Sequence, residues 1–183
     1  ERLGLLFSPS LSSFYMSKKS DRWSKEECWT RGMSVEDVFY NLYKPIDPSI
    51  RKATLKEQYQ HIDHFTKIGA IDVKARKRIA RSGAIQDDLT WLEFKHTNGG
   101  AGWLYGKADF IAFERLYGFV LVARSDLASM AEEKCVLGDL VANPRDSLYK
   151  GYTRKGNKDL ISMVKMDDIL ALPHQVVQYQ ELI

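Results

Sequence analysis

The segment 70–75, with the sequence AIDVKA, alternates strictly between apolar and charged side chains. Because successive side chains of a strand point to opposite faces, this pattern predicts a strand with Asp72 and Lys74 together on one face. Asp63 lies nine residues before Asp72, and a turn signal at 67–69 separates the two. Neighbouring strands of a hairpin lie about 4.8 Å apart, so we expect the carboxyl groups of Asp63 and Asp72 to converge.

The remaining patterns predict helices and strands in mixed order. Capping-box spacing predicts helix starts at Ser34 and Thr54, and Ser125 or Asp126 is expected to begin a helix that reaches about residue 135. Further strands are predicted at 60–65, 90–95, 110–113, 119–123 and 160–166, with a loop at 143–158 and a helical turn at 167–170. This order favours an α/β fold of α+β-like character, with one central mixed β-sheet flanked by helices.

Length and composition exclude several classes of protein. The chain has 183 residues, of which 44% are apolar, about the size of one domain with a substantial core. We expect residues 23–183 to form one domain, and residues 1–22 to be a flexible or non-native extension. No apolar run approaches the roughly 20 residues of a membrane span. Two cysteines are too few for a secreted disulfide scaffold, so a reduced, intracellular protein is expected.

The acids around the predicted hairpin point to a divalent cation. Mg²⁺ prefers one or two carboxylates together with water and phosphate oxygens, and Asp63 and Asp72 would supply such a pair. Lys74 would then stabilise charge that develops on a phosphate or position the attacking water. A third acid, Glu36, lies beside the apolar stripe of the first predicted helix, from where it is expected to reach the same place.

A helix acid, an aspartate at a strand end and a strand carrying Asp-x-Lys together resemble the PD-(D/E)XK nuclease superfamily. The resemblance covers roughly residues 32–123 and implies a restriction-endonuclease-like core, as in Holliday-junction resolvases and phage nucleases. It implies that Asp63 and Asp72, helped by the backbone carbonyl of Val73, bind Mg²⁺ or Mn²⁺. It further implies catalysis by Lys74, an accessory acid role for Glu36, and products with 5′-phosphate and 3′-hydroxyl ends.

A second acid–lysine pair, Glu93 and Lys95, lies on another predicted strand. We prefer the pair Asp72 and Lys74, because the short connection to Asp63 fits the motif better. Glu93 stays open as the true motif acid, or as an additional acid that faces the same pocket from a neighbouring strand. The superfamily often has proline before the first aspartate, where this chain has Ile62, and that position varies widely.

Basic and aromatic residues near the motif are expected to contact nucleic acid. No acid occurs between Val73 and Gln86, and lysines and arginines there can contact a phosphate backbone. The basic segment 154–158 is a second candidate contact. Trp103 lies in a glycine-flanked loop and is expected to stack on a base. The predicted nucleic-acid-binding residues are Arg76, Lys77, Arg78, Arg81, Trp103 and Lys107.

Together these features predict an Mg²⁺-dependent endodeoxyribonuclease, a phosphodiester hydrolase that acts on DNA in the cytoplasm. The resemblance makes a phage or mobile-element origin one expectation, and a two-fold homodimer is one arrangement that would cut both strands of a duplex. The net charge of +3 is too small to argue for nucleic acid by itself. The alternatives are a catalytically silent nucleic-acid-binding module on the same fold, and an interaction protein in which the motif is accidental.

Overall fold

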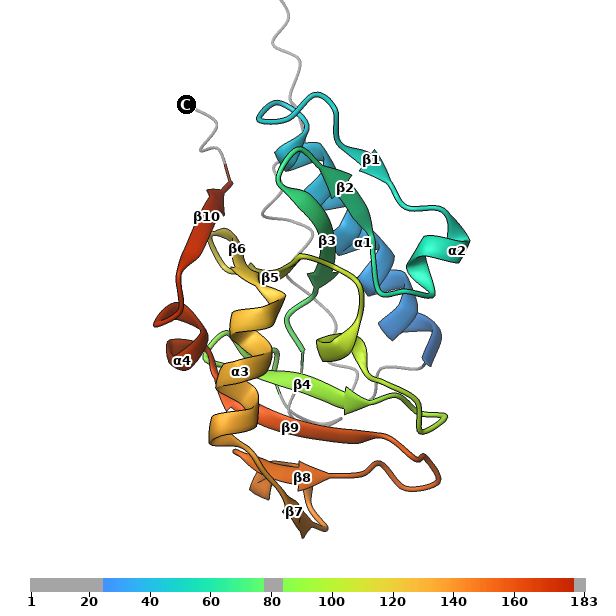
Figure 1. The fold of residues 1–183 in the computed structure, drawn as a ribbon, viewed down its shortest axis with the longest axis vertical. Helices are drawn as coiled ribbons and strands as arrows, with labels where there is room; N and C mark the ends of the chain where they lie inside the picture. The colour runs from blue at the N-terminus through green and yellow to red at the C-terminus, as the bar shows by residue number, and fades with distance from the viewer. Residues whose placement is uncertain (1–24, 78–83, 180–183) are drawn as a thin grey trace, which may run out of the picture.

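The computed structural model describes residues 25–77 and 84–179, which form two mixed β-sheets with a few helices (Figure 1). The predicted extension at 1–22 lies outside the described residues. A fold of α+β character with mixed sheets is therefore confirmed. The prediction of one central sheet is wrong, because the strands divide into a six-stranded and a four-stranded sheet.

The larger sheet has the strand order β1-β2-β3-β5-β6-β10. Its strands are β1 (Arg51–Lys52), β2 (His64–Thr66), β3 (Gly69–Lys74), β5 (Phe110–Arg115), β6 (Gly118–Ala123) and β10 (His174–Gln178). The central pair β3 and β5 is parallel and every other pair is antiparallel. The expected strand at 60–65 is shorter than predicted and is confined to β2, while β1 and β10 were not predicted.

The smaller sheet has the order β4-β9-β8-β7. It consists of β4 (Leu89–Lys95), β7 (Val136–Val141), β8 (Lys150–Tyr152) and β9 (Leu160–Lys165). The segment 143–158 was predicted as loop, but it contains β8 and a short 3-10 helix, η3 (Pro144–Asp146). Because β4 pairs with the distant β9, the expectation that Glu93 lies on a strand neighbouring β3 is wrong.

Helix α1 (Lys25–Tyr43) packs on one face of the larger sheet. Its buried residues Val35, Phe39 and Tyr43 repeat at helical spacing. The helix begins well before Ser34, so the predicted start is wrong: the capping-box spacing there falls inside a longer helix, whose backbone hydrogen bonds need no cap at that point.

The other helices are short. Helix α2 (Leu55–Gln58) begins after Thr54 with the predicted capping box, in which Glu57 accepts from the Thr54 backbone. Helix α3 (Arg124–Lys134) begins one or two residues before the predicted caps and has no side-chain cap. Helix α4 (Met166–Leu170) corresponds to the predicted last helical turn, and η2 (Trp103–Tyr105) is a single 3-10 turn.

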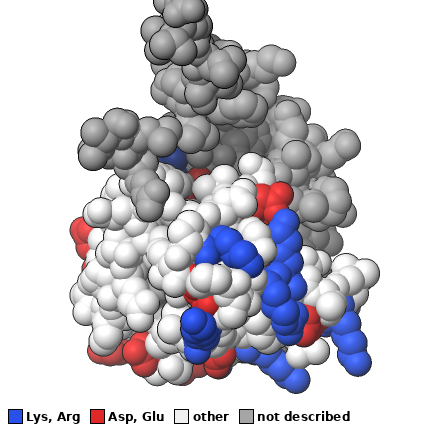
Figure 2. All heavy atoms as spheres, turned by 90° about the horizontal axis from the view of Figure 1, so that it is seen from above, with Lys and Arg blue, Asp and Glu red and all other residues white. Residues whose placement is uncertain are grey.

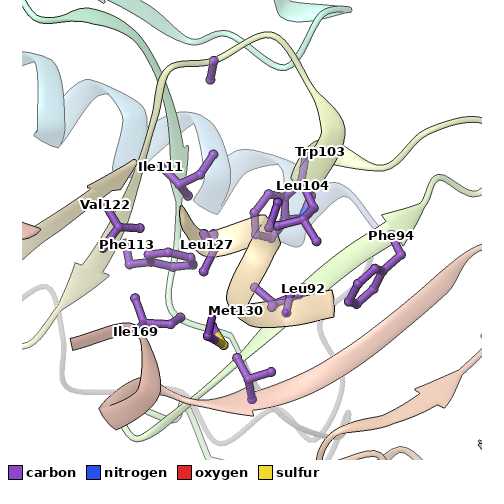
Figure 3. Close-up of a cluster of buried hydrophobic side chains, with 14 of the residues drawn as sticks. Leu92, Phe94, Trp103, Leu104, Ile111, Phe113, Val122, Leu127, Met130 and Ile169 are labelled. Carbon is purple, nitrogen blue, oxygen red and sulfur yellow. The ribbon is translucent and has the colours of Figure 1, made fainter. Parts of the chain in front are cut away.

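Two apolar clusters lie on opposite faces of the larger sheet. Ile71 and Val73 of β3 belong to the cluster beneath α1. The other cluster fills the space among the larger sheet, β4, α3 and η2 (Figure 3), and its members include Leu92, Trp103, Ile111, Phe113 and Leu127. Asp72 and Lys74 lie opposite Ile111 and Phe113 in the parallel register. The charged face of β3 is therefore turned toward this second cluster.

Candidate active site

The β2–β3 hairpin brings Asp63 beside the charged face of β3, as predicted. The backbone N–H of Asp63 donates to the carbonyl of Ile71 at 2.8 Å, which continues the ladder by one residue. The backbone N–H of Val73 donates to Oδ2 of Asp63 at 2.7 Å. The Asp63 carboxylate is thereby held against the backbone of the strand that carries Asp72.

Asp72 and Lys74 form a buried ion pair with one unsatisfied carboxylate oxygen. The Lys74 ammonium donates to Oδ1 of Asp72 at 2.6 Å. Asp72 is only 2% exposed, and its Oδ2 has no hydrogen-bond partner. Buried polar atoms normally find a partner, so an orphaned carboxylate oxygen indicates a position that another group can occupy.

The acids of this site outnumber its cation. Burial raises the pKa of the Asp72 carboxyl well above its usual range, and the charge of Asp63 adds to this rise against the opposing charge of Lys74. Burial disfavours the charged form of Lys74, but Asp72 and Asp63 outweigh this effect, so the pKa of Lys74 is raised. Lys74 thus stays an ammonium, and the negative charge around it is only partly neutralised.

Glu36 of α1 lies close enough to the same cluster to interact with its charges. The residue is half-buried and lies beside the buried Val35 in sequence. Burial, and next the charge of Asp63, raise the pKa of Glu36 from 4.5 to about 7, while Lys74 opposes the rise. A carboxyl group with this pKa changes protonation near neutral pH, which is the range in which general acids and bases work best.

The smaller sheet contributes Glu93 to the edge of the site. The Trp103 backbone N–H points to Oε2 of Glu93 at 3.4 Å, and the Lys74 ammonium lies 4.9 Å from the centre of the Trp103 ring. The charge of Glu93 acts on Lys74 and raises its pKa. The additional-acid role of Glu93 thus keeps a structural basis across the two sheets, although β4 does not adjoin β3.

Trp103 does not lie where base stacking requires it. The side chain is 8% exposed and packs edge-on against Phe113. The preceding Gly102 lets the loop fold inward, because a Cβ at that position would come within 2.1 Å of the Glu93 carbonyl oxygen. The predicted stacking role is therefore wrong in this conformation, and Trp103 instead forms a wall of the site next to Lys74.

The predicted basic cluster after β3 is only partly available for a phosphate backbone. The Arg76 guanidinium is largely buried and lies 3.8 Å from the Asp87 carboxylate, so its predicted contact with nucleic acid is wrong here. Lys77 is exposed. Arg78 and Arg81 lie outside the described residues. Lys107 is exposed on the connection after η2.

The side chains of this site offer two of the carboxylate ligands that a divalent cation such as Mg²⁺ needs. No group of three or more His, Cys, Asp or Glu side chains within 25–77 and 84–179 is arranged to hold a metal ion. Mg²⁺, however, binds proteins through as few as one or two carboxylates and keeps several waters. Asp63 and Asp72 offer such a pair, and the orphaned Oδ2 of Asp72 and the uncompensated charge are the features that a cation would relieve.

Sequence reasoning did not connect two other charged groups to this region. Arg154 lies with its guanidinium 3.8 Å from Oε1 of Glu93, and it comes from a loop sixty residues later. Asp87 holds Arg115 at 3.0 Å and accepts from the Leu116 backbone. No local pattern could have identified either partner, because both contacts depend on how the two sheets pack together.

Comparisons with known proteins leave the site to be judged on its own chemistry. No family model, no curated protein and no solved structure matches the chain. Among the described helices, none has both the length and the apolar character that a bilayer crossing requires.

Proposed function

We propose that this protein is a metal-dependent endonuclease of the PD-(D/E)XK type that hydrolyses phosphodiester bonds in DNA. The observation that carries the proposal is the convergence of Asp63 and Asp72 beside Lys74, with one Asp72 oxygen left unpaired. Glu36 lies close enough to interact with their charges. Buried polar atoms normally find a partner, and here the orphaned oxygen lies beside a second acid, Asp63. A cluster that keeps unneutralised acid is better suited to binding a cation and a reacting phosphate.

Each side chain has a separate role in this proposal. Asp63 and Asp72 would hold Mg²⁺ or Mn²⁺, which supplies charge stabilisation at the phosphate and a nucleophile at neutral pH. Lys74, kept as an ammonium by its acidic neighbours, would donate to a non-bridging phosphate oxygen and stabilise the charge that develops there. Trp103 covers Lys74 on one side and limits the access of bulk water.

Glu36 is suited to accept the proton of the attacking water. Its pKa of about 7 lets it be ionised for part of the population at neutral pH and hold the proton afterwards. Water oxygen forms the new bond to phosphorus and the bond to the 3′-oxygen breaks. The proton lost by water goes to Glu36, and the leaving 3′-oxygen takes a proton from solvent.

The test is cleavage of supercoiled plasmid, and of a matched RNA, with Mg²⁺, with Mn²⁺ and with EDTA. We expect metal-dependent nicking or linearisation of DNA that falls by about 100-fold or more in Lys74→Ala, because one positioned electrostatic group is removed. Lys56→Ala is the matched control, since Lys56 is an exposed lysine of α2 outside the predicted site.

Different failures point to different conclusions. Equal cleavage by wild type and Lys74→Ala would refute the assignment of Lys74, and metal-independent cleavage would refute the proposed cofactor. Saturable DNA binding without cleavage under either metal would favour the catalytically silent binding module on this fold.

A further inference from the structure

The loops after β4 and after β8 together form a basic surface next to the candidate active site. We define the two-loop rim as the exposed cations Lys95, Arg154, Lys155 and Lys158. The two loops lie side by side at the open ends of β4 and β8 (Figure 1), and the Lys158 backbone N–H donates to the Thr97 carbonyl at 3.1 Å. Residues far apart in sequence therefore make one continuous surface.

This surface carries little opposing charge. No acidic residue occurs between Glu93 and Asp109, or between Asp146 and Asp159. Asp159 itself is buried, and its carboxylate accepts from both the backbone and the guanidinium of Arg154. Its charge is therefore used to hold the loop and is turned away from solvent.

The lysines of the rim are also available for a ligand. Among the described residues, no side-chain hydrogen bond or ion pair is made by Lys95, Lys155 or Lys158. Unpaired lysines are free to replace the counterions of a nucleic-acid backbone, which is the main source of affinity for such backbones. Paired lysines would first have to break an existing contact.

Arg154 joins the rim to the candidate active site. Its guanidinium lies beside Asp159 and within 3.8 Å of Glu93, whose charge acts on Lys74. The rings of His61 and His96 lie 6.4 Å apart and connect the hairpin that carries Asp63 to the start of the same loop. A backbone that lies along the rim is thus led toward the acids around Lys74.

We propose that the two-loop rim binds the phosphate backbone of the DNA duplex and delivers it to the site. The proposal rests on the proposed function for its substrate. The rim replaces the DNA contact surface that the sequence predicted. In that surface, Arg76 after β3 is buried against Asp87, and Trp103 is buried as well.

The test compares two triple variants of the full chain. The rim variant is Lys95→Ala/Lys155→Ala/Lys158→Ala. The control is Lys56→Ala/Lys67→Ala/Lys165→Ala, which removes the same charge from exposed positions outside the rim. Lys and Arg side chains also gather on the face seen from above (Figure 2), so the effect of net charge alone has to be measured. Binding of a fluorescent DNA duplex is followed by anisotropy in EDTA, so that no cleavage interferes, across a series of salt concentrations.

We expect the rim variant to bind the DNA duplex about tenfold more weakly than wild type does. The slope of log K against log salt concentration should be shallower by about 0.9 for each lost phosphate contact, or ~2.7 for the three lysines. The control variant should keep the slope of wild type. With Mg²⁺, the rim variant should raise KM for DNA while kcat changes little, because the acids and Lys74 are intact. Thermal unfolding should match wild type, since no side-chain contact of the described chain is removed.

The outcomes separate this proposal from the proposed function. Wild type that binds duplex through the rim but cuts nothing would refute the nuclease and keep the rim. Cleavage by wild type, with equal affinity and slope in the rim variant, would refute the rim alone. An equal loss in both triple variants would show only a general effect of net charge and would also overturn the rim.

Discussion

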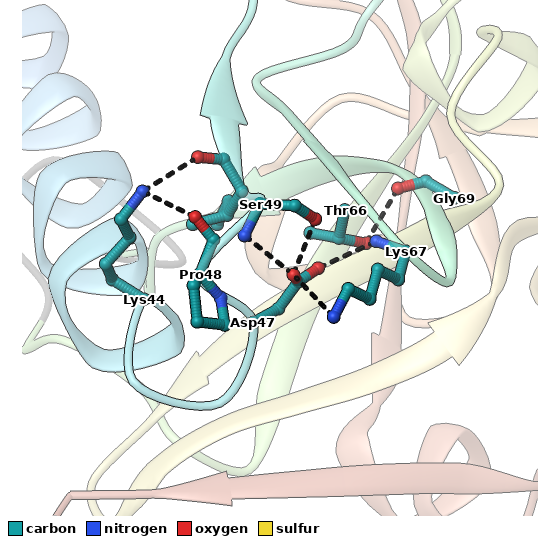
Figure 4. Close-up of polar contacts among 8 residues, drawn as sticks. Lys44, Asp47, Pro48, Ser49, Thr66, Lys67 and Gly69 are labelled. Carbon is teal, nitrogen blue, oxygen red and sulfur yellow. Dashed lines mark hydrogen bonds and ion pairs between the residues drawn. The ribbon is translucent and has the colours of Figure 1, made fainter.

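Two aspartates of this protein are buried to nearly the same degree but have opposite surroundings. Asp47 is 4% exposed and Asp72 is 2% exposed. The Asp47 carboxylate accepts from the backbone N–H and the hydroxyl of Ser49 and from the backbone N–H of Lys67 (Figure 4). The Asp72 carboxylate accepts from Lys74 and lies beside a second acid, Asp63, and its Oδ2 accepts no hydrogen bond.

The difference appears directly in the acidity of the two groups. The hydrogen bonds from Ser49 and from Lys67 lower the pKa of Asp47, whereas burial raises the pKa of Asp72. Burial alone therefore does not identify a functional acid. What distinguishes Asp72 is an unused carboxylate oxygen next to a second acid, which costs stability unless a ligand completes it.

The largest expected effect is on catalysis by Asp72→Asn. Asparagine keeps the shape but removes the charge, so we expect cleavage to fall by at least about 100-fold. The variant should still fold, because Asp63 continues to offset part of the Lys74 charge, but its Tm should fall because the buried ion pair is lost. Plasmid cleavage and thermal unfolding of the same sample measure both quantities.

The effect of Mg²⁺ on thermal stability gives a second test of Asp72. A ligand that binds only the folded state raises Tm, so Mg²⁺ should stabilise wild type and leave Asp72→Asn unchanged. Cleavage at the wild-type rate by Asp72→Asn, or equal stabilisation of both proteins by Mg²⁺, would remove Asp72 from the proposed site.

The next largest effect is on stability, and it belongs to Asp47→Asn. An amide can donate as well as accept, so it cannot receive all of the hydrogen bonds that converge on Asp47. We expect Tm to fall by about 5 °C, with cleavage per folded molecule unchanged. If this variant lost activity at full stability, the comparison between a structural and a functional aspartate would fail.

Local patterns predicted the hairpin and the charged face of β3 because both depend on neighbouring residues. Side chains two apart on a strand share a face wherever that strand lies, so the pairing of Asp72 with Lys74 was readable from the sequence. The capping box at Thr54 is equally local. Glu36 could be placed near the hairpin because α1 uses its apolar stripe to pack on β3.

The division into two sheets could not be read in this way. The strand at 90–95 was predicted, but its partner in the sheet is β9, some seventy residues later. The burial of Trp103 follows from the close approach of Gly102 to β4, and the burial of Arg76 follows from its contact with Asp87. These positions depend on long-range packing, which local periodicity does not report.

The smallest expected effect concerns pH and Glu36. The folded-state pKa of Glu36 is about 7, above its ordinary value of 4.5, so between these pH values the folded chain binds more protons than the unfolded chain. Stability should therefore fall as pH rises from 4.5 to about 7 and then level off. Asp47 has the opposite sign, because its lowered pKa contributes stability that is lost only as pH falls through the acid range.

Glu36→Gln should make the metal-free Tm less dependent on pH in this window. The side chain is only half-buried, so solvent screening limits the change to about one or two degrees. Asp72 acts with the same sign and keeps part of the slope. Tm measured from pH 4.5 to 8 in EDTA for wild type, Glu36→Gln and the exposed control Glu133→Gln tests this. An unchanged slope in Glu36→Gln would mean that Glu36 does not share the charge of the Asp63 and Asp72 cluster, and its role as proton acceptor would then fall with it.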